Sequence, residues 1–435
     1  MSDQAFETRS IHAGAAPDPA TGARQTPVYQ TTSYVFEDSQ HAADLFALKK
    51  LGFIYSRLTN PTVGVLQDRM ASLEGGIGAT ATSSGHAAQL LALFPFMEPG
   101  AEFLAAKQLY GGSINQFTVS FPRAFGWNST LVDATDPENF RKAANDKVRA
   151  IFIESLANPG GMVMDIEAIA AIANDLGVPL IVDNTMATPF LCQPIEHGAH
   201  IVVHSTTKFL SGNGTSIGGV VIDSGKFDWA QSDKFAGLTA PEGGYHGLKF
   251  HETFGEMAYT FHNIAVGLRD LGVNQQPQNA FLTLLGIETL ALRMERHCAN
   301  ALRVAEYLST RPDVTWVEYA GLASSKYHSL AKKYTPKGAG SVFTFGLKGG
   351  YDAGKALVDS VKMFSHVANI GDTRSLIIHP ASTTHSQLSP EDREAAGAGP
   401  DVVRLSIGIE GVEDIIADLD QALAAAGGTG QQAAE

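Results

Sequence analysis

The chain has 435 residues, of which 44% are hydrophobic and 17% are charged, a composition typical of a folded globular protein. Its formal net charge of −14 argues against a nucleic-acid-binding protein, because no basic surplus is present to neutralise phosphates. Two cysteines give no disulfide framework, the first residues lack a signal pattern, and the apolar runs are short, so we expect a cytoplasmic protein without a membrane partner.

Residues 1–62 are predicted to form an N-terminal extended arm, because prolines interrupt them and few apolar side chains are available for a core. Near the end of this arm, Tyr55 and Arg57 precede the pair Asn60-Pro61, which is typical of a helix start. An arginine fork beside a phenol could bind a phosphate. Taken alone, the pattern favours an ordinary surface arginine near a helix N-terminus.

From residue 63 onward, buried strands alternate with helices. Apolar or small-residue runs predict strands at 79–82, 102–106, 148–153 and 180–182 and another from 201, with helices at 87–97 and about 165–176. This alternation indicates a parallel sheet with right-handed crossovers. In such sheets, ligands bind at the carboxyl ends of the strands.

Polar residues follow each of these strands. They are Ser84-Gly85-His86, Tyr110, Asn158, Asp183 and Ser205 to Lys208. A small-residue turn that opens a helix can bind an anion, although His86 by itself would be a packing or capping residue. Asp183 alone could cap a helix, and an isolated lysine is usually solvated. Together, a carboxylate and a desolvated lysine at adjacent strand ends suit pyridoxal phosphate, whose pyridine nitrogen and aldehyde they would hold.

The second half of the chain changes character. Residues 224–262 form a polar, glycine-containing insertion, and a helical stretch from about 278 to 310 leads to strands near 314–319, 341–347 and 402–407. Helices near 352–363 and 412–424 complete an α+β unit. We therefore expect a cofactor-binding domain at 63–265, a C-terminal domain at 266–426 and a flexible tail at 427–435. His379 and His385 lack metal-ligand spacing, so no metal is expected.

Six motifs together resemble the Cys/Met-metabolism family of pyridoxal-phosphate enzymes, and the resemblance covers about residues 8–425. They are Tyr55-Ser-Arg-Leu-Thr-Asn-Pro-Thr62, Ser84-Gly-His86, Tyr110-Gly-Gly112, Val182-Asp-Asn-Thr185, His204-Ser-Thr-Thr-Lys208 and Arg404-Leu-Ser-Ile-Gly-Ile-Glu410. The resemblance implies an α/β fold of the aspartate-aminotransferase type (fold type I), with a mainly parallel large sheet and a smaller α+β domain.

The resemblance also implies a role for each matching residue. Lys208 would form the Schiff base and then shuttle protons, Asp183 would pair with the pyridine nitrogen, and Tyr110 would stack on the ring and assist proton transfer. Arg404 would bind the substrate α-carboxylate, with Asn369 and Tyr55 near the substrate. The remaining cofactor contacts would come from Ser84, Gly85, His86, Asn158, Ser205 and Thr207, and from Tyr55 and Arg57 of a neighbouring subunit in a homotetramer.

Departures from other branches of the family point to the O-acetylhomoserine sulfhydrylases. His86 stands where lyases commonly carry an apolar residue, Gly112 stands where methionine γ-lyases carry cysteine, and Asn369-Ile370-Gly371 replaces a Ser-Leu-Gly stretch. The implied reaction replaces the acetate of O-acetyl-L-homoserine with sulfide or methanethiol. An O-succinylhomoserine sulfhydrylase, a cystathionine γ-synthase and a methionine γ-lyase remain alternatives. A non-catalytic cofactor-binding protein is disfavoured, because the lysine, tyrosine and arginine are all present.

Overall fold

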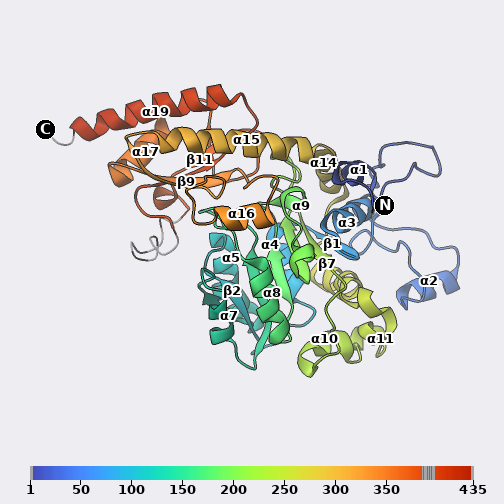
Figure 1. The fold of residues 1–435 in the computed structure, drawn as a ribbon. Coiled ribbons are helices and arrows are strands. Elements are labelled where there is room, and N and C mark those ends of the chain that lie inside the picture. Colours follow the sequence, from blue (N-terminus) through green and yellow to red (C-terminus); the bar gives the residue numbers. More distant parts are fainter. Residues whose placement is uncertain are drawn as a thin grey trace.

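The computed structural model describes residues 3–384, 386, 389, 391, 393 and 397–432, so His385 lies outside the described residues. A seven-stranded sheet forms the centre of the N-terminal half (Figure 1). Its strand order is β1 (Gly78–Thr82), β7 (Gly219–Asp223), β6 (Ile201–Ser205), β5 (Leu180–Asp183), β4 (Val148–Glu154), β2 (Glu102–Ala106) and β3 (Asn128–Val132).

Strand direction places the predicted polar clusters at one edge of this sheet. Strand β7 pairs antiparallel with both β1 and β6, whereas β6, β5, β4, β2 and β3 pair parallel. Two antiparallel pairings in succession leave β1 parallel to β6. The carboxyl ends of β1, β6, β5, β4 and β2 therefore share an edge, which confirms the predicted mainly parallel sheet.

The strands of this sheet are buried on both faces because helices pack against it. Helix α3 (Pro61–Glu74) packs against β1 and β7, and α4 (Gly85–Leu93) packs against β6 and β7. Helix α8 (Ile166–Asp175) begins at Asp165, whose carboxylate accepts a hydrogen bond from the N–H of Ala168 at 3.4 Å. The predicted amphipathic helix is thus present with its cap.

The C-terminal half of the chain contains a second, five-stranded sheet. Its strand order is β10 (Ser365–His366), β11 (Leu376–Ile378), β12 (Val402–Ser406), β9 (Val342–Leu347) and β8 (Val314–Glu318). Helices α15 (Leu290–Ser309) and α19 (Val412–Gln432) lie side by side over it, with α17 (Gly350–Ser360) against α19 (Figure 1). The helical stretch expected at 278–310 is two helices, α14 (Pro277–Glu288) and α15, because the backbone leaves the helical range at Thr289 (φ −110°, ψ 11°).

Both ends of the chain contain more helix than expected. The N-terminal arm carries α1 (Phe6–His12), anchored by Phe6 against Phe190 with ring centroids 5.3 Å apart, and α2 (Ser39–Phe46), capped by Asp38. The segment with α2 projects from the body of the molecule (Figure 1). At the other end, α19 continues to Gln432, past the alanines at 424–426 and into the glycine-containing segment expected to be a tail.

The 224–262 insertion has its own aromatic cluster. Phe227, Trp229, Phe235 and Tyr259 are buried, and the Trp229 and Tyr259 rings stack with their centroids 5.3 Å apart.

Within the described residues, no helix is long and apolar enough to cross a membrane. The remaining helices are α5 (Gly111–Asn115), η1 (Gln116–Ser120), α6 (Phe121–Phe125), α7 (Glu138–Ala143), α9 (Thr188–Leu191), η2 (Pro194–His197), η3 (Asp233–Phe235), α10 (Ala236–Thr239), η4 (Gly243–Tyr245), α11 (Phe250–Phe254), η5 (Gly255–Met257), α12 (Ala258–His262), η6 (Asn263–Leu268), α13 (Arg269–Leu271), α16 (His328–Tyr334) and η7 (Pro380–Ser382).

Candidate active site

A cavity of about 200 Å³ lies where the carboxyl edge of the large sheet meets β12 and the segment at 368–370. It contains every predicted site residue except Tyr55 and Arg57. The lining residues are Ser84, Gly85, His86, Gln89, Tyr110, Glu154, Leu156, Asn158, Asp183, Thr185, Met186, Ser205, Thr207, Lys208, Ala368, Asn369, Ile370 and Arg404. Residues up to 320 positions apart therefore form one site (Ser84 to Arg404, 404 − 84).

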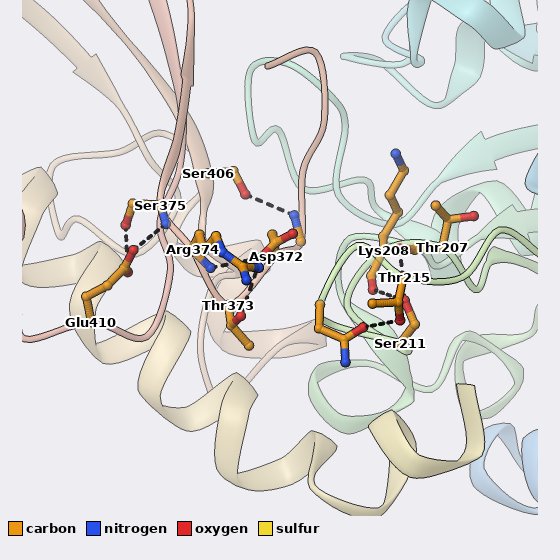
Figure 2. Close-up of polar contacts among 12 residues, drawn as sticks. Thr207, Lys208, Ser211, Thr215, Asp372, Thr373, Arg374, Ser375, Ser406 and Glu410 are labelled. Carbon is orange, nitrogen blue, oxygen red and sulfur yellow. Dashed lines mark hydrogen bonds and ion pairs between the residues drawn. The ribbon is translucent and has the colours of Figure 1, made fainter. Parts of the chain in front are cut away.

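Lys208 enters this cavity from the turn that follows β6. The turn is closed beneath it, because the Ser211 hydroxyl donates to the carbonyl of Thr207 at 3.0 Å. Figure 2 shows the Lys208 side chain pointing away from Ser211, and its ammonium group donates to Oδ1 of Asn369. Burial, together with the nearby positive charge of Arg404, lowers the pKa of Lys208 to about 8. A lysine in this state is readily deprotonated to a nucleophile.

Arg404 contributes a buried positive charge from the opposite wall. Its guanidinium donates to Oδ1 of Asn158 at 3.2 Å and to the carbonyl of Asn369 at 3.1 Å. Burial lowers its pKa to about 10, so it remains charged at neutral pH. In the described part of the chain it forms no ion pair with a carboxylate. The planar fork is therefore available for the carboxylate of a ligand.

Asp183, the last residue of β5, has a fixed orientation. One carboxylate oxygen accepts the N–H of Thr185 at 3.0 Å, and the other accepts the side-chain amide of Gln89 at 3.3 Å. Gln89 also donates to the hydroxyl of Ser113 at 2.9 Å. These bonds aim a carboxylate at the cavity, where it can pair with a protonated ring nitrogen.

The start of α4 forms an anion cradle on the same side of the cavity. The carbonyl and hydroxyl of Ser84 accept from Ala88 and Ala87, which leaves the first helical N–H groups, those of Gly85 and His86, for a ligand. A Cβ at Gly85 would lie 2.7 Å from Cβ of Ser205, so only glycine fits there. The hydroxyls of Ser205 and Thr207 line the same space.

Tyr110 presents its ring at the cavity next to His86, with centroids 6.0 Å apart and an angle of 30°. A Cβ at Gly112 would lie 2.4 Å from Cε1 of Tyr110 and 3.1 Å from His86. A larger residue at 112 would therefore displace the tyrosine ring from this position. The glycine that distinguishes this sequence from methionine γ-lyases thus has a steric consequence inside the site.

Hydrogen bonds fix the loop between β10 and β11, which carries Asn369. The backbone N–H of Gly371 donates to Ser406 at 3.0 Å, and Glu410 accepts from the N–H and hydroxyl of Ser375 (Figure 2). On its other side, the Lys208 turn is contacted by Arg293, which donates to the carbonyl of Phe209 at 2.7 Å. Lys208 therefore lies between the large sheet and the segment at 368–370.

Tyr55 and Arg57 do not line the cavity of their own chain. The Arg57 guanidinium lies 5.5 Å from the Tyr55 ring centroid on the exposed arm. The sequence interpretation also gave no site role to three polar residues that do line it, Gln89, Glu154 and Thr185. Glu154 ends β4 as Asp183 ends β5, so the strand-end rule could have found it. Gln89 lies within a helix and has no such signal.

Comparisons with known proteins agree with this geometry. The family described as Cys/Met metabolism PLP-dependent enzymes matches residues 7–424. The chain is 50% identical to an O-acetyl-L-homoserine sulfhydrylase of Leptospira meyeri over 96% of each chain, and 48% identical to a homocysteine synthase of Schizosaccharomyces pombe over 96% of this chain and 98% of that one. A crystal structure from Campylobacter jejuni, described as an O-acetylhomoserine (thiol)-lyase with N'-pyridoxyl-lysine-5'-monophosphate, superposes with a TM-score of 0.94 at 40% identity, covering 97% of this chain and 100% of that one.

Proposed function

Because this chain belongs to the family of Cys/Met-metabolism PLP-dependent enzymes, we propose that it catalyses γ-replacement on O-acetyl-L-homoserine. Sulfide or methanethiol takes the place of the acetate group, and the products are acetate and L-homocysteine or methionine. The observation that carries this proposal is the convergence of Lys208, Asp183 and Arg404 on one cavity. Relatives 45–50% identical over nearly the whole chain carry the corresponding names.

The residues present fit pyridoxal phosphate. The open N–H groups at the start of α4 and the hydroxyls of Ser205 and Thr207 suit its phosphate, and the Asp183 carboxylate suits its ring nitrogen. The Asn158 amide would suit the ring hydroxyl, and the Tyr110 ring would stack on the cofactor. When bound, the cofactor supplies an aldehyde for Lys208 and an electron-withdrawing ring.

Each side chain in the cavity then has a separate role in the proposed reaction. Arg404 holds the α-carboxylate of the substrate, which orients the Cα–H bond relative to the ring. Asp183 keeps the ring nitrogen protonated and so maintains its electron demand. With the cofactor and substrate bound, the Lys208 amine would accept the Cα proton and return it at the end. The hydrogen bond to Asn369 would hold the free amine in reach between these steps.

The direct test is to mix purified protein with O-acetyl-L-homoserine and sulfide and to measure homocysteine. We expect homocysteine and acetate in equal amounts. O-succinyl-L-homoserine as a competing donor identifies the acyl group. Formation of 2-oxobutanoate and ammonia without homocysteine would instead identify a γ-lyase.

The rate at which cofactor-free protein attaches pyridoxal phosphate should depend on pH through Lys208. Only the neutral amine reacts, and burial lowers its pKa to about 8, so we expect the rate to rise with pH and to level off above about pH 8. Replacing Arg404 with glutamine removes a neighbouring positive charge and should move the midpoint to higher pH. Borohydride reduction followed by mass spectrometry measures the attached fraction. A midpoint near the ordinary lysine pKa of 10.5 would show that Lys208 is not desolvated.

We also propose a cytoplasmic homotetramer in which the arm of one subunit completes the site of another. The arm exposes large apolar side chains, Val35, Phe46 and Leu51 among them, which a second copy would cover. Tyr55 and Arg57 lie on this arm, away from their own cavity. Cys192 and Cys298 are free thiols, which suits a reducing compartment.

Mixed subunits test the shared site. Arg57→Ala and Lys208→Ala proteins should each be inactive, whereas refolding them together should restore up to about a quarter of the activity, because half of the dimers are then heterodimers with one complete site. The matched control mixes Lys208→Ala with Asp183→Ala. Both residues lie in the same cavity, so no complete site can form. Rescue in the control, or none in the test, would contradict the shared site.

A further inference from the structure

Glu154 is a buried carboxylate in the cavity wall for which the reaction above has no role. It ends β4, is only 5% exposed and lines the same cavity as Asp183 and Lys208. One carboxylate oxygen accepts the backbone N–H of Tyr110 at 2.7 Å, and the other accepts the backbone N–H of Asn158 at 3.0 Å. The two segments that it joins are 48 residues apart in sequence (158 − 110).

The burial of this carboxylate costs free energy of folding. Glu154 pairs in register with Asp183 on β5, so the two acidic side chains leave adjacent strands on the same face. Burial raises the pKa of Glu154 well above its usual value, and the charge of Asp183 acts in the same direction. Among the residues that the structure describes, Glu154 forms no ion pair. Its two N–H donors therefore supply the compensation that a buried carboxylate requires.

Both donors belong to residues of the proposed cofactor site. Tyr110 N–H lies at the start of α5, and the ring of the same residue faces the cavity. Asn158 N–H lies in the loop after β4, and its side chain accepts from Arg404. The distance between the ring that stacks on the cofactor and the amide that holds Arg404 therefore depends on the residue between them.

We propose that Glu154 is a positioning residue, which ties the Tyr110 segment to the Asn158 segment through one carboxylate and so sets the width of the cofactor site. This inference rests on the proposed function only for its consequence in catalysis. Both oxygens are needed, because a glutamine offers one acceptor and turns an NH₂ group toward the second N–H. An aspartate keeps the charge and lacks the length to reach both segments.

Backbone amide hydrogen exchange of the holoenzyme tests the bridge directly. In the unsubstituted protein we expect both the Tyr110 and the Asn158 amides to be protected. In both Glu154→Gln and Glu154→Asp, at least one of these two amides should exchange faster by about 10-fold or more. An acceleration of this size is expected when a hydrogen bond to a charged group is lost. The visible absorbance of the cofactor should also be lost faster on dilution.

The matched control is Glu102→Gln at the opposite end of the adjacent strand β2. Glu102 is a carboxylate that accepts from the side chains of Thr130 and Asn145, so its loss reports on general weakening of the sheet. We expect no change in exchange at Tyr110 or Asn158 in this variant. If the control accelerates exchange there equally, Glu154 has only a general structural role.

Each remaining outcome is decisive. Unprotected amides in the unsubstituted protein would overturn the proposal even if no Glu154 variant folds. A lowered kcat with unchanged exchange and unchanged cofactor release would make Glu154 a direct acid–base group and overturn it as well. If the two amides exchanged at the normal rate in Glu154→Asp but faster in Glu154→Gln, the negative charge would be required and the bridge between the two segments would not. Altered exchange in a protein that forms no homocysteine would support the bridge and refute only the proposed function.

Discussion

Replacing Lys208 with alanine should abolish γ-replacement while leaving the fold intact. In the proposed function, this amine binds the cofactor aldehyde and moves the Cα proton, and loss of the proton transfer alone costs about 10²–10⁴-fold in kcat. The side chain forms one hydrogen bond, to Asn369, so little stability is lost. Homocysteine formation measures the activity, and thermal unfolding measures the stability. Borohydride should no longer fix the visible absorbance to the protein.

The matched control for this prediction is Lys249→Ala. Lys249 forms an exposed ion pair with Glu252 at 2.7 Å on α11, and such surface pairs contribute about 0–1 kcal/mol. Its removal should leave activity and borohydride fixation unchanged. If Lys208→Ala kept full turnover, the chain would have to act through another nucleophile, and the role given to this cavity would be wrong.

Sequence patterns predicted the part of the site that depends on single strands. Asp183 and Lys208 each follow a run of buried apolar residues, and the shared direction of β5 and β6 brings them together. The same rule places Ser84 and Asn158 at this edge. Local sequence sufficed here because the carboxyl ends of parallel strands meet wherever the chain returns to the sheet.

The parts that sequence could not supply depend on contacts between distant segments. The Glu154 bridge needs the N–H of Tyr110, which comes from a different strand–helix unit. The break between α14 and α15 falls at Thr289, and Gly286, three residues earlier, lies inside α14 and does not mark its end. Strand β10 has two residues, Ser365 and His366, and only its pairing with β11 makes it a strand. Such features have no periodicity that could reveal them.

The arm illustrates a different limit. Its apolar residues were too few to predict a core, and the structure adds two short helices to it, one of which packs on the body through Phe6. The motif Tyr55 to Thr62 resembles the family strongly, yet Tyr55 and Arg57 stay outside the cavity of the same chain. The mixed-subunit experiment tests whether these two residues enter the cavity of a second copy.

Replacing Arg404 with lysine should raise KM for O-acetyl-L-homoserine sharply and lower kcat/KM by about 10²-fold, because truncation of a buried, hydrogen-bonded charge pair is expensive. Lysine keeps the positive charge and loses the planar fork, so it cannot bind a carboxylate through two parallel bonds. It also cannot maintain both bonds of the guanidinium, to Asn158 and to the carbonyl of Asn369. Initial rates over a range of substrate concentrations give both constants.

The control is Arg374→Lys on the loop behind the site. Arg374 is largely exposed and pairs with Asp372 at 3.1 Å, so the same change of head group there should leave both constants near those of the unsubstituted protein. An Arg404→Lys enzyme with unchanged KM would mean that the substrate carboxylate binds elsewhere. If kcat of Arg404→Lys fell by as much as kcat/KM while KM stayed unchanged, the role of Arg404 would instead be to lower the pKa of Lys208. The pH profile of that variant would then shift upward, because the charge beside Lys208 would be farther away.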